Sequence, residues 1–203
     1  SFIKERIGKY YRQPATVIYP PVNISKFKLQ TTNYKLQDYF LMVGRLVSYK
    51  RFDLAVRVFN RLGLPLKIVG IGPEFNKLKK MAGPPAGRAG KNIEFLGLVS
   101  DERLAGLYAG ARALIFPQEE DFGIVPLESM ASGKPVIAYG VGGALETIVE
   151  GKTGLFFREM TDDSLAAAIR KFETTKFDPW ACRRQAEKFD ISVFKENILK
   201  HLS

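Results

Sequence analysis

Cysteine and histidine are almost missing from this chain of 203 residues, which has one of each, Cys182 and His201. A single cysteine excludes a disulfide framework, and the two residues cannot build a Cys/His metal site. Neither is expected to act as a nucleophile, because Cys182 lies in a late helical stretch without a partner and His201 lies two residues from the end. We therefore expect Cys182 to be a core residue and the protein to need no metal and no cofactor.

Long apolar runs are lacking too, since no segment approaches the roughly 20 residues that cross a bilayer. The first eleven residues follow the pattern of an amphipathic helix and do not resemble a secretory signal. We therefore expect a cytoplasmic protein. The sequence does not begin with Met, which suggests a piece of a longer protein. With 46% apolar residues it can bury a core of its own.

The net charge of +10 is unevenly distributed. Residues 1–40 carry a charge of +5, whereas residues 101–150 carry −5. A nucleic-acid-binding protein needs a continuous basic face, so we expect no nucleic-acid partner. The basic charge of residues 1–40 suits contact with an anionic membrane, such as the inner face of the cell membrane, or with an anionic acceptor. An ordinary basic, solvated surface is the alternative.

Six short apolar runs alternate with helical stretches, which predicts an α/β fold with a Rossmann-like, parallel six-stranded sheet and helices on both faces. The expected strands are residues 39–43, 66–69, 93–96, 113–116, 136–138 and 155–157. Ser100, Thr161 and Asp178 are expected to cap helices. Extra helices are expected at the two ends, over residues 1–11 and after residue 175. A β-like run is expected at Thr16–Tyr19.

Glycines and charged residues follow most of these strands directly. In a parallel sheet, ligands bind beyond the carboxyl ends of the strands, so we expect one rim of the sheet to hold the site. The loop Gly83–Gly90 at the opposite edge carries no comparable group. The rim loops are Gly44-Arg45, Gly70–Gly72, Gly97–Val99, Pro117–Gly123 and Tyr139–Gly143.

Two cations follow the first strand, Arg45 and Lys50. Arginine can donate two hydrogen bonds to a phosphate and lysine adds a point charge, so the two could neutralise a diphosphate, or they could simply be solvated. Gly70 and Gly72 invite a dinucleotide-binding interpretation. Phe75 stands where that fingerprint requires its third glycine, so the interpretation fails.

Two carboxylates, Glu120 and Glu128, lie close together in the sequence. Paired carboxylates suggest a glycosidase, but sequence spacing does not fix their separation in space. Glu128 is expected on a helix, pointing to the rim, where it could accept hydrogen bonds from ribose hydroxyls. The helix start at Gly123–Pro126 offers free N–H groups to an anion, and the Gly140–Gly143 loop would allow close approach of a sugar or phosphate.

These motifs together resemble a known family. The run EDFGIVPLESMASGKPVIA from Glu120, with GRLVSYK from Gly44 and GGALETIVEGKTG from Gly142, resembles the retaining GT-B glycosyltransferases of the glycosyl transferases group 1 family. The likeness extends from about Ile3 to Lys171, and its mannosyltransferase branch is the most similar. The opening FIKERIGKYY and VIYPPVN are similar to the segment that enters the second of this family's two domains.

The resemblance implies roles for individual residues. The implied catalytic residues are Glu120, which contacts hydroxyls of the donor sugar, and Arg45 and Lys50, which hold the diphosphate of the leaving group. The ribose would bind to Glu128. The other implied donor-binding residues are Gly44, Gly72, Gly97, Leu98, Val99, Phe122, Gly123 and Ile124. The implied reaction transfers a sugar with retention and without a metal, from GDP-mannose as first choice or from a UDP-sugar, to a saccharide or lipid-linked acceptor.

The resemblance also implies a domain plan. Residues 1–37 would be a linker helix and connecting segment, 38–175 a nucleotide-sugar-binding Rossmann-like domain, and 176–203 C-terminal helices. The chain would then be one half of a GT-B fold, without the N-terminal domain that binds the acceptor, and we expect little turnover from it alone. The alternatives are a nucleotide-sugar-binding module without activity and a GT-B nucleotide-sugar epimerase.

Overall fold

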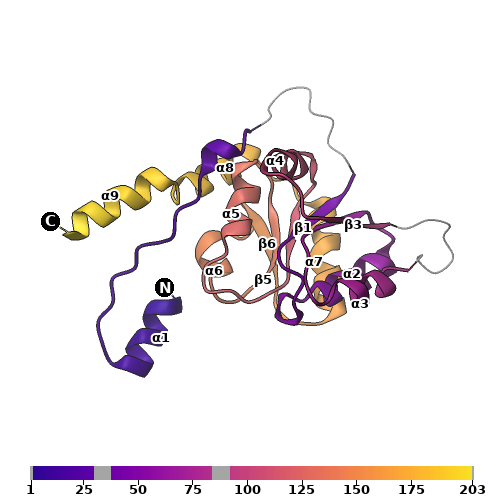
Figure 1. Cartoon of the computed structure of the whole chain (residues 1–203), viewed down its shortest axis with the longest axis horizontal. Helices are drawn as coiled ribbons and strands as arrows, with labels where there is room; N and C mark the ends of the chain where they lie inside the picture. Colours follow the sequence, from indigo (N-terminus) through magenta and orange to yellow (C-terminus); the bar gives the residue numbers. More distant parts are fainter. Residues whose placement is uncertain (1, 30–37, 84–91, 203) are drawn as a thin grey trace.

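Six strands form a single sheet at the centre of the molecule (Figure 1). The computed structural model describes residues 2–29, 38–83 and 92–202. Every pair of neighbouring strands is parallel, in the order β3-β2-β1-β4-β5-β6. The predicted parallel six-stranded sheet is therefore confirmed. The strands are β1 (Phe40–Val43), β2 (Leu66–Val69), β3 (Ile93–Gly97), β4 (Leu114–Phe116), β5 (Val136–Tyr139) and β6 (Gly154–Phe157).

Three helices begin where local capping chemistry predicts. The side chains of Ser100, Thr161 and Asp178 accept hydrogen bonds from backbone N–H groups at the starts of α4, α7 and α8. α5 begins two residues earlier than the predicted Pro126. The helices are α1 (Phe2–Tyr11), α2 (Phe52–Leu62), α3 (Phe75–Met81), α4 (Asp101–Gly110), α5 (Ile124–Ala131), α6 (Ala144–Thr147), α7 (Asp162–Thr174), α8 (Pro179–Glu187) and α9 (Ile191–Leu202), with 3-10 turns η1 (Ile24–Lys26) and η2 (Ser48–Lys50).

Helices cover both faces of the sheet (Figure 1). α2, α3 and α7 pack on one face, where Phe40 of β1 contacts Phe59 of α2 and Phe172 of α7 in edge-on aromatic pairs. α4, α5, α6 and α8 pack on the other face. The strands are buried on both sides, which is why they read in the sequence as continuous apolar runs. Cys182 of α8 lies in this second core and is fully buried, as predicted.

The expected β-like run at Thr16–Tyr19 is wrong. Residues 12–21 form neither helix nor strand, and only Val22 makes an isolated bridge, to Asp190. The physical reason is packing, because the ring of Tyr19 contacts both Phe122 and Phe189, with centroid distances of 5.4 and 5.3 Å. Aromatic burial holds this segment in an extended form without a partner strand. Residues 30–37 and most of the predicted loop Gly83–Gly90 lie outside the described residues.

One arginine ties the N-terminal segment to the domain. Nη1 of Arg183, on α8, donates hydrogen bonds to the carbonyl oxygens of Ile24 and Phe27 and to that of Ala131 at the end of α5. The carbonyl of Ile24 also accepts a hydrogen bond from Phe27 N at the end of η1, whereas those of Phe27 and Ala131 lie at or just past the ends of their elements. Arg183 therefore joins three segments that are far apart in the sequence.

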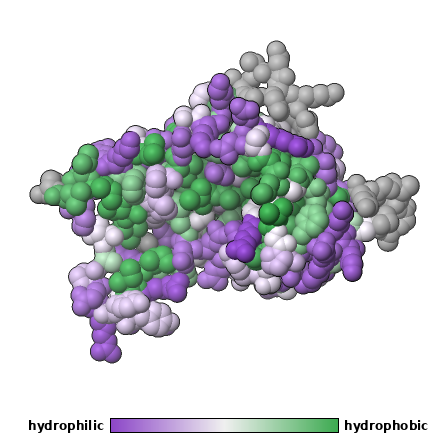
Figure 2. All heavy atoms as spheres, viewed as in Figure 1, coloured by the Kyte–Doolittle hydropathy of each residue, from purple (hydrophilic) through white to green (hydrophobic). Residues whose placement is uncertain are grey.

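The two terminal helices lie at the edge of the molecule, and neither has a buried residue (Figure 1). Hydrophobic residues gather on α9 at the left of Figure 2, where Leu199 and Leu202 are exposed. Among the helices of the described ranges, none is both long and apolar enough to cross a membrane.

Candidate functional site

The sheet order creates a crevice at its centre. β1 and β4 are neighbours, but β1 continues to β2 on one side and β4 continues to β5 on the other. The loops that leave their carboxyl ends therefore turn in opposite directions, and such a switch point is where open α/β sheets bind ligands. Lys50 comes from the loop after β1 and Glu120 from the loop after β4.

Lys50 and Glu120 meet across this crevice. Nζ of Lys50 lies 2.8 Å from Oε1 of Glu120, and the two side chains are 14% and 23% exposed. Gln118, which is 2% exposed, donates from Nε2 to the same oxygen at 3.2 Å. Two donors on one carboxylate oxygen fix the orientation of Glu120. Sequence reasoning selected Lys50 and Glu120 separately, and the structure brings them together.

Arg45 follows Gly44, whose neighbour in space is Lys50. A β-carbon added to Gly44 would lie 3.4 Å from Nζ of Lys50. Gly44 and Arg45 line an open cavity of about 450 Å³ together with the predicted residues Gly72, Leu98 and Val99. The cavity has a cation at one end and a mostly apolar wall, so it can accept a flat ring system next to an anion. Gly97 does not line it, but its carbonyl accepts a hydrogen bond from Gly70 N at 2.8 Å and holds the rim loops together.

The glycines of the rim serve a purpose that the sequence did not reveal. A β-carbon on Gly143 would lie 2.3 Å from Cα of Phe122, and Gly143 N donates to the carbonyl of Glu120 at 2.8 Å. A β-carbon on Gly72 would lie 2.4 Å from the carbonyl oxygen of Leu46. The Glu120 turn therefore lies directly against Gly142 and Gly143, and the close approach of a sugar or phosphate to Gly140–Gly143 stays a prediction. These glycines allow the loops of the rim to pack closely.

The start of α5 follows the Glu120 turn. Gly123 has a φ of 92°, which favours glycine, and Ile124 is the first residue of the helix and is 44% exposed. The first N–H groups of α5 therefore lie next to the crevice and can donate to an anion. The side chain of Phe122 points away from them and stacks on Tyr19.

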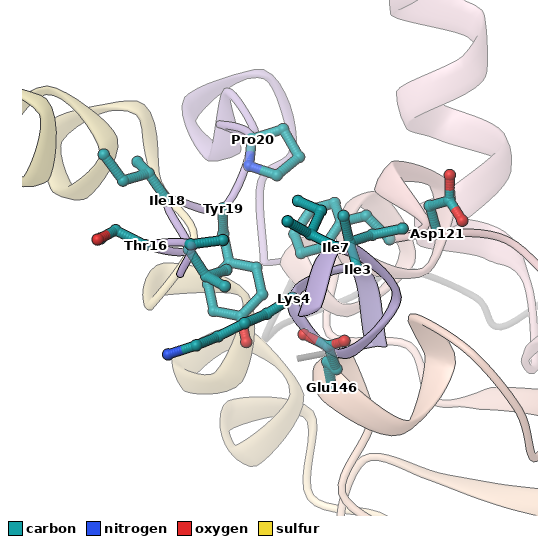
Figure 3. Close-up of a pocket in the computed structure, with 12 residues that line it drawn as sticks. Ile3, Lys4, Ile7, Thr16, Ile18, Tyr19, Pro20, Asp121 and Glu146 are labelled. Atoms are coloured by element: carbon teal, nitrogen blue, oxygen red, sulfur yellow. The ribbon is translucent and has the colours of Figure 1, made fainter. Parts of the chain in front are cut away.

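Phe122 and α1 enclose a separate, apolar pocket of about 220 Å³. Figure 3 shows Ile3 and Ile7 of α1 facing Tyr19 and Pro20 across it, with Glu146 at its edge. Glu146 accepts a hydrogen bond from Phe2 N at 2.6 Å and another from the hydroxyl of Tyr19. Burial, with the nearby Glu146 carboxylate, raises the pKa of Tyr19 to about 12.

Glu128 lies farther along α5, and its carboxylate is partly shielded. Its Oε2 accepts a hydrogen bond of 2.8 Å from the hydroxyl of Tyr108, a fully buried residue of α4. Burial raises the pKa of Glu128 above its ordinary value, and the hydrogen bond from Tyr108 opposes that shift. Sequence reasoning placed Glu128 on the rim but missed both Tyr108 and Gln118. A polar residue directly after a buried strand was the available signal for Gln118, whereas Tyr108 reads as an ordinary core residue.

An open cavity of about 430 Å³ lies next to Glu120. Tyr49 and Tyr139 line it, and so does Arg6, which reaches from α1 to pair with Asp121 at 3.2 Å. The room and the polar lining suit a hydroxylated ligand beside Glu120. Within the described parts of the chain, no three Asp, Glu, His or Cys side chains are grouped so that they could hold a metal ion.

The family model described as "Glycosyl transferases group 1" matches residues 23–189 of this sequence. The chain belongs to this family. Among the curated members is the alpha-1,3/1,6-mannosyltransferase ALG2 of Mus musculus, which is 29% identical over 235 residues and matches 100% of this chain and 56% of its own length. The chain spans about half the length of the curated relatives it matches.

Solved structures of glycosyltransferases have the same fold as this chain. HepE of Anabaena, solved in complex with UDP and glucose, superposes with a TM-score of 0.78 at 21% identity, over 92% of this chain and 56% of that one. A glycosyltransferase of Rickettsia africae gives a TM-score of 0.83 at 23% identity, over 98% and 60% of the two chains. The domain is therefore one Rossmann-like half of a GT-B fold, similar to that of the mannosyltransferases.

Proposed function

We propose that this domain binds the nucleotide-diphosphate sugar for a retaining hexosyltransferase, with GDP-mannose as the favoured donor. The observation that carries the proposal is the Lys50–Glu120 pair at the switch point of the sheet, beside the cavity of Arg45. In this arrangement Arg45 and Lys50 are cations that suit a diphosphate, and Glu120 is a carboxylate that suits sugar hydroxyls. The mannosyltransferase relatives favour mannose. HepE, solved with UDP, makes a UDP-sugar the second choice.

Each part of the donor then has a partner on the rim. The nucleobase enters the cavity of Gly72, Leu98 and Val99, and the diphosphate lies against Arg45, Lys50 and the first N–H groups of α5. The ribose hydroxyls donate to Glu128, and the sugar hydroxyls donate to Glu120. An ammonium has three donors, so Lys50 can contact a phosphate while it keeps Glu120 in place.

The chemistry that follows is departure of the nucleoside diphosphate from a cation-like sugar centre. Arg45, Lys50 and the N-terminus of α5 stabilise the negative charge that develops on the leaving phosphate. The acceptor oxygen forms its bond to the sugar carbon on the face that the phosphate leaves, its proton passes to an oxygen of the leaving phosphate, and the configuration is retained. This scheme assigns the charge stabilisation to side chains and backbone and requires no metal ion or cofactor.

The acceptor, a saccharide or a lipid-linked saccharide, binds to a second GT-B domain in this proposal. That domain closes the crevice from the opposite side, as the length of the relatives suggests. The 203 residues alone would bind the donor weakly and transfer little sugar. The basic N-terminal segment would place the enzyme in the cytoplasm, against the anionic inner face of a membrane.

The proposal is tested by calorimetric titration of this chain with GDP, UDP and ADP, repeated on Arg45→Ala and Glu128→Ala. We expect one nucleotide to bind best and both substitutions to weaken it about 10-fold or more. Arg184→Ala is the matched control, because its side chain is 63% exposed and pairs with Asp178, which is not a rim residue. Equal binding by all four proteins, or rapid sugar transfer by this chain alone, would contradict the proposal.

A further inference from the structure

Two buried tyrosines, one before β1 and one on α4, use their hydroxyls in different ways. The hydroxyl of Tyr39, before β1, donates to the backbone carbonyl of Leu107 at 2.7 Å. The hydroxyl of Tyr108 donates instead to a carboxylate, Oε2 of Glu128, at 2.8 Å. A buried hydroxyl needs a partner, and a backbone carbonyl meets that need without bringing a charge toward the core. The need for a hydrogen-bond partner therefore does not by itself explain why Tyr108 donates to a carboxylate.

The Tyr108 ring is completely buried in the domain. It is 0% exposed and packs edge-on against Phe27, with a centroid distance of 5.6 Å. Burial and the charge of Glu128 raise the pKa of Tyr108 well above its ordinary value, so the phenol stays protonated and remains a donor at neutral pH. A donor that can neither move nor ionise restricts its acceptor to a single orientation.

Three groups in the described chain act on the charge of Glu128. Tyr108 favours the ionised form through its hydrogen bond, Asp101 of α4 disfavours it, and Lys26 of η1 favours it. Lys26 and Asp101 pair with each other at 2.8 Å and are more than half exposed, so solvent screens both. Tyr108 therefore contributes most to keeping Glu128 ionised against the effect of burial.

We propose that Tyr108 is a positioning residue of the donor site, which holds Glu128 as an ionised, oriented acceptor for the two adjacent hydroxyls of a ribose. This inference rests on the proposed function. Among the described residues, no group donates to the other oxygen of Glu128, Oε1, so that oxygen is left for the ligand. A diol needs an acceptor with free lone pairs, and a protonated carboxyl would offer fewer of them. Tyr108 acts through Glu128 and touches no part of the donor.

The first test needs no nucleotide. Glutamate side chains are labelled with ¹³C at the carboxyl carbon, the Glu128 signal is assigned with Glu128→Gln, and its titration is followed by NMR in the wild type, Tyr108→Phe and Tyr39→Phe. Each phenylalanine variant keeps the ring and loses one buried hydroxyl, so Tyr39→Phe is matched to Tyr108→Phe. We expect the midpoint of Glu128 to rise in Tyr108→Phe only. An unchanged midpoint in a folded Tyr108→Phe would overturn the inference.

The second test measures GDP and UDP binding at several pH values between 5 and 8. We expect Tyr108→Phe to bind about 10-fold more weakly than the wild type near the acidic end, with the difference shrinking as the pH rises and Glu128 ionises again. Tyr39→Phe is expected to follow the wild-type profile. A loss of affinity that is the same at every pH would indicate a merely structural role and would count against the inference. If the wild type binds neither nucleotide, the proposed function fails, while the NMR titration still decides the role of Tyr108.

Discussion

Lys50 and Glu120 form an ion pair of 2.8 Å that bridges the two halves of the sheet. Lys50 belongs to the half that contains β1, β2 and β3, and Glu120 to the half with β4, β5 and β6. Since both side chains are mostly shielded, the pair is screened less than an exposed one and holds its geometry. The crevice is thus organised before any ligand arrives, with a cation and a carboxylate already in contact.

Substitution of Lys50 tests its role toward phosphate. We expect Lys50→Met to weaken binding of the preferred nucleoside diphosphate about 10-fold or more, because a charge-assisted contact is lost, and to leave binding of the matching nucleoside unchanged. Lys77→Met is the control, since Lys77 is 62% exposed and pairs with Glu74. Calorimetry on both variants with both ligands makes the comparison. An equal loss for nucleoside and diphosphate would mean that Lys50 does not contact the phosphates.

Gly143 is expected to be sensitive to a single added methyl group. Its β-carbon would lie 2.3 Å from Cα of Phe122, so Gly143→Ala forces the Glu120 turn to move and lowers the free energy of unfolding by about 1–3 kcal/mol. Gly8→Ala is the matched control, because nothing lies within 4 Å of its added β-carbon on α1. Urea unfolding followed by circular dichroism measures both. A Gly143→Ala protein as stable as the wild type would refute the close packing of these two loops.

Arg183 is expected to contribute to stability far more than its neighbour Arg184. Arg183→Met removes the guanidinium donor from the carbonyl groups of Phe27 and Ala131 and one of the two donors of Ile24, and should lower the free energy of unfolding by about 2–4 kcal/mol. Arg184→Met removes only an exposed pair with Asp178 and should change it by less than about 1 kcal/mol. Chemical denaturation decides between them, and similar values for the two variants would contradict the anchoring role of Arg183.

The buried thiol of Cys182 predicts a pH effect of known sign. Burial raises its pKa to about 12, so folding favours the neutral thiol. Its contribution to stability is complete below the unfolded-state pKa of about 8.5 and is lost as the pH rises toward 12. We expect the stability difference between the wild type and Cys182→Ala to shrink over that range. We also expect iodoacetamide to label Cys182 only in urea, and rapid labelling of the folded protein at pH 8 would show that the thiol is accessible.

The fold could be predicted because its signals are local. Strands buried on both faces are mostly apolar, so Leu66–Val69, in which Lys67 is the one polar residue, appears in the sequence with its observed bounds. Caps such as Ser100 and Asp178 mark helix starts through side chains that bond to their own neighbours. The strand predicted at Thr16–Tyr19 was wrong because β-forming residues need a partner strand, and here the packing of Tyr19 against Phe122 and Phe189 decided the conformation.

The candidate site was predictable only as a set of residues. The contact between Lys50 and Glu120 depends on β1 lying next to β4, and nothing in the sequence states the order of strands. The partners of the carboxylates were missed for the same reason. Tyr108 has the pattern of a core position, and its bond to Glu128 exists only because α4 and α5 pack side by side.

The position of Tyr19 has a consequence for where the folded unit begins. Residues 12–21 have no regular secondary structure, yet the ring of Tyr19 packs against both Phe122 and Phe189, which also contact each other. A shortened protein that starts at the first strand would leave those two rings open to water and to other molecules. The smallest autonomous version of this domain is therefore set by side-chain burial, and its N-terminal boundary lies well before β1.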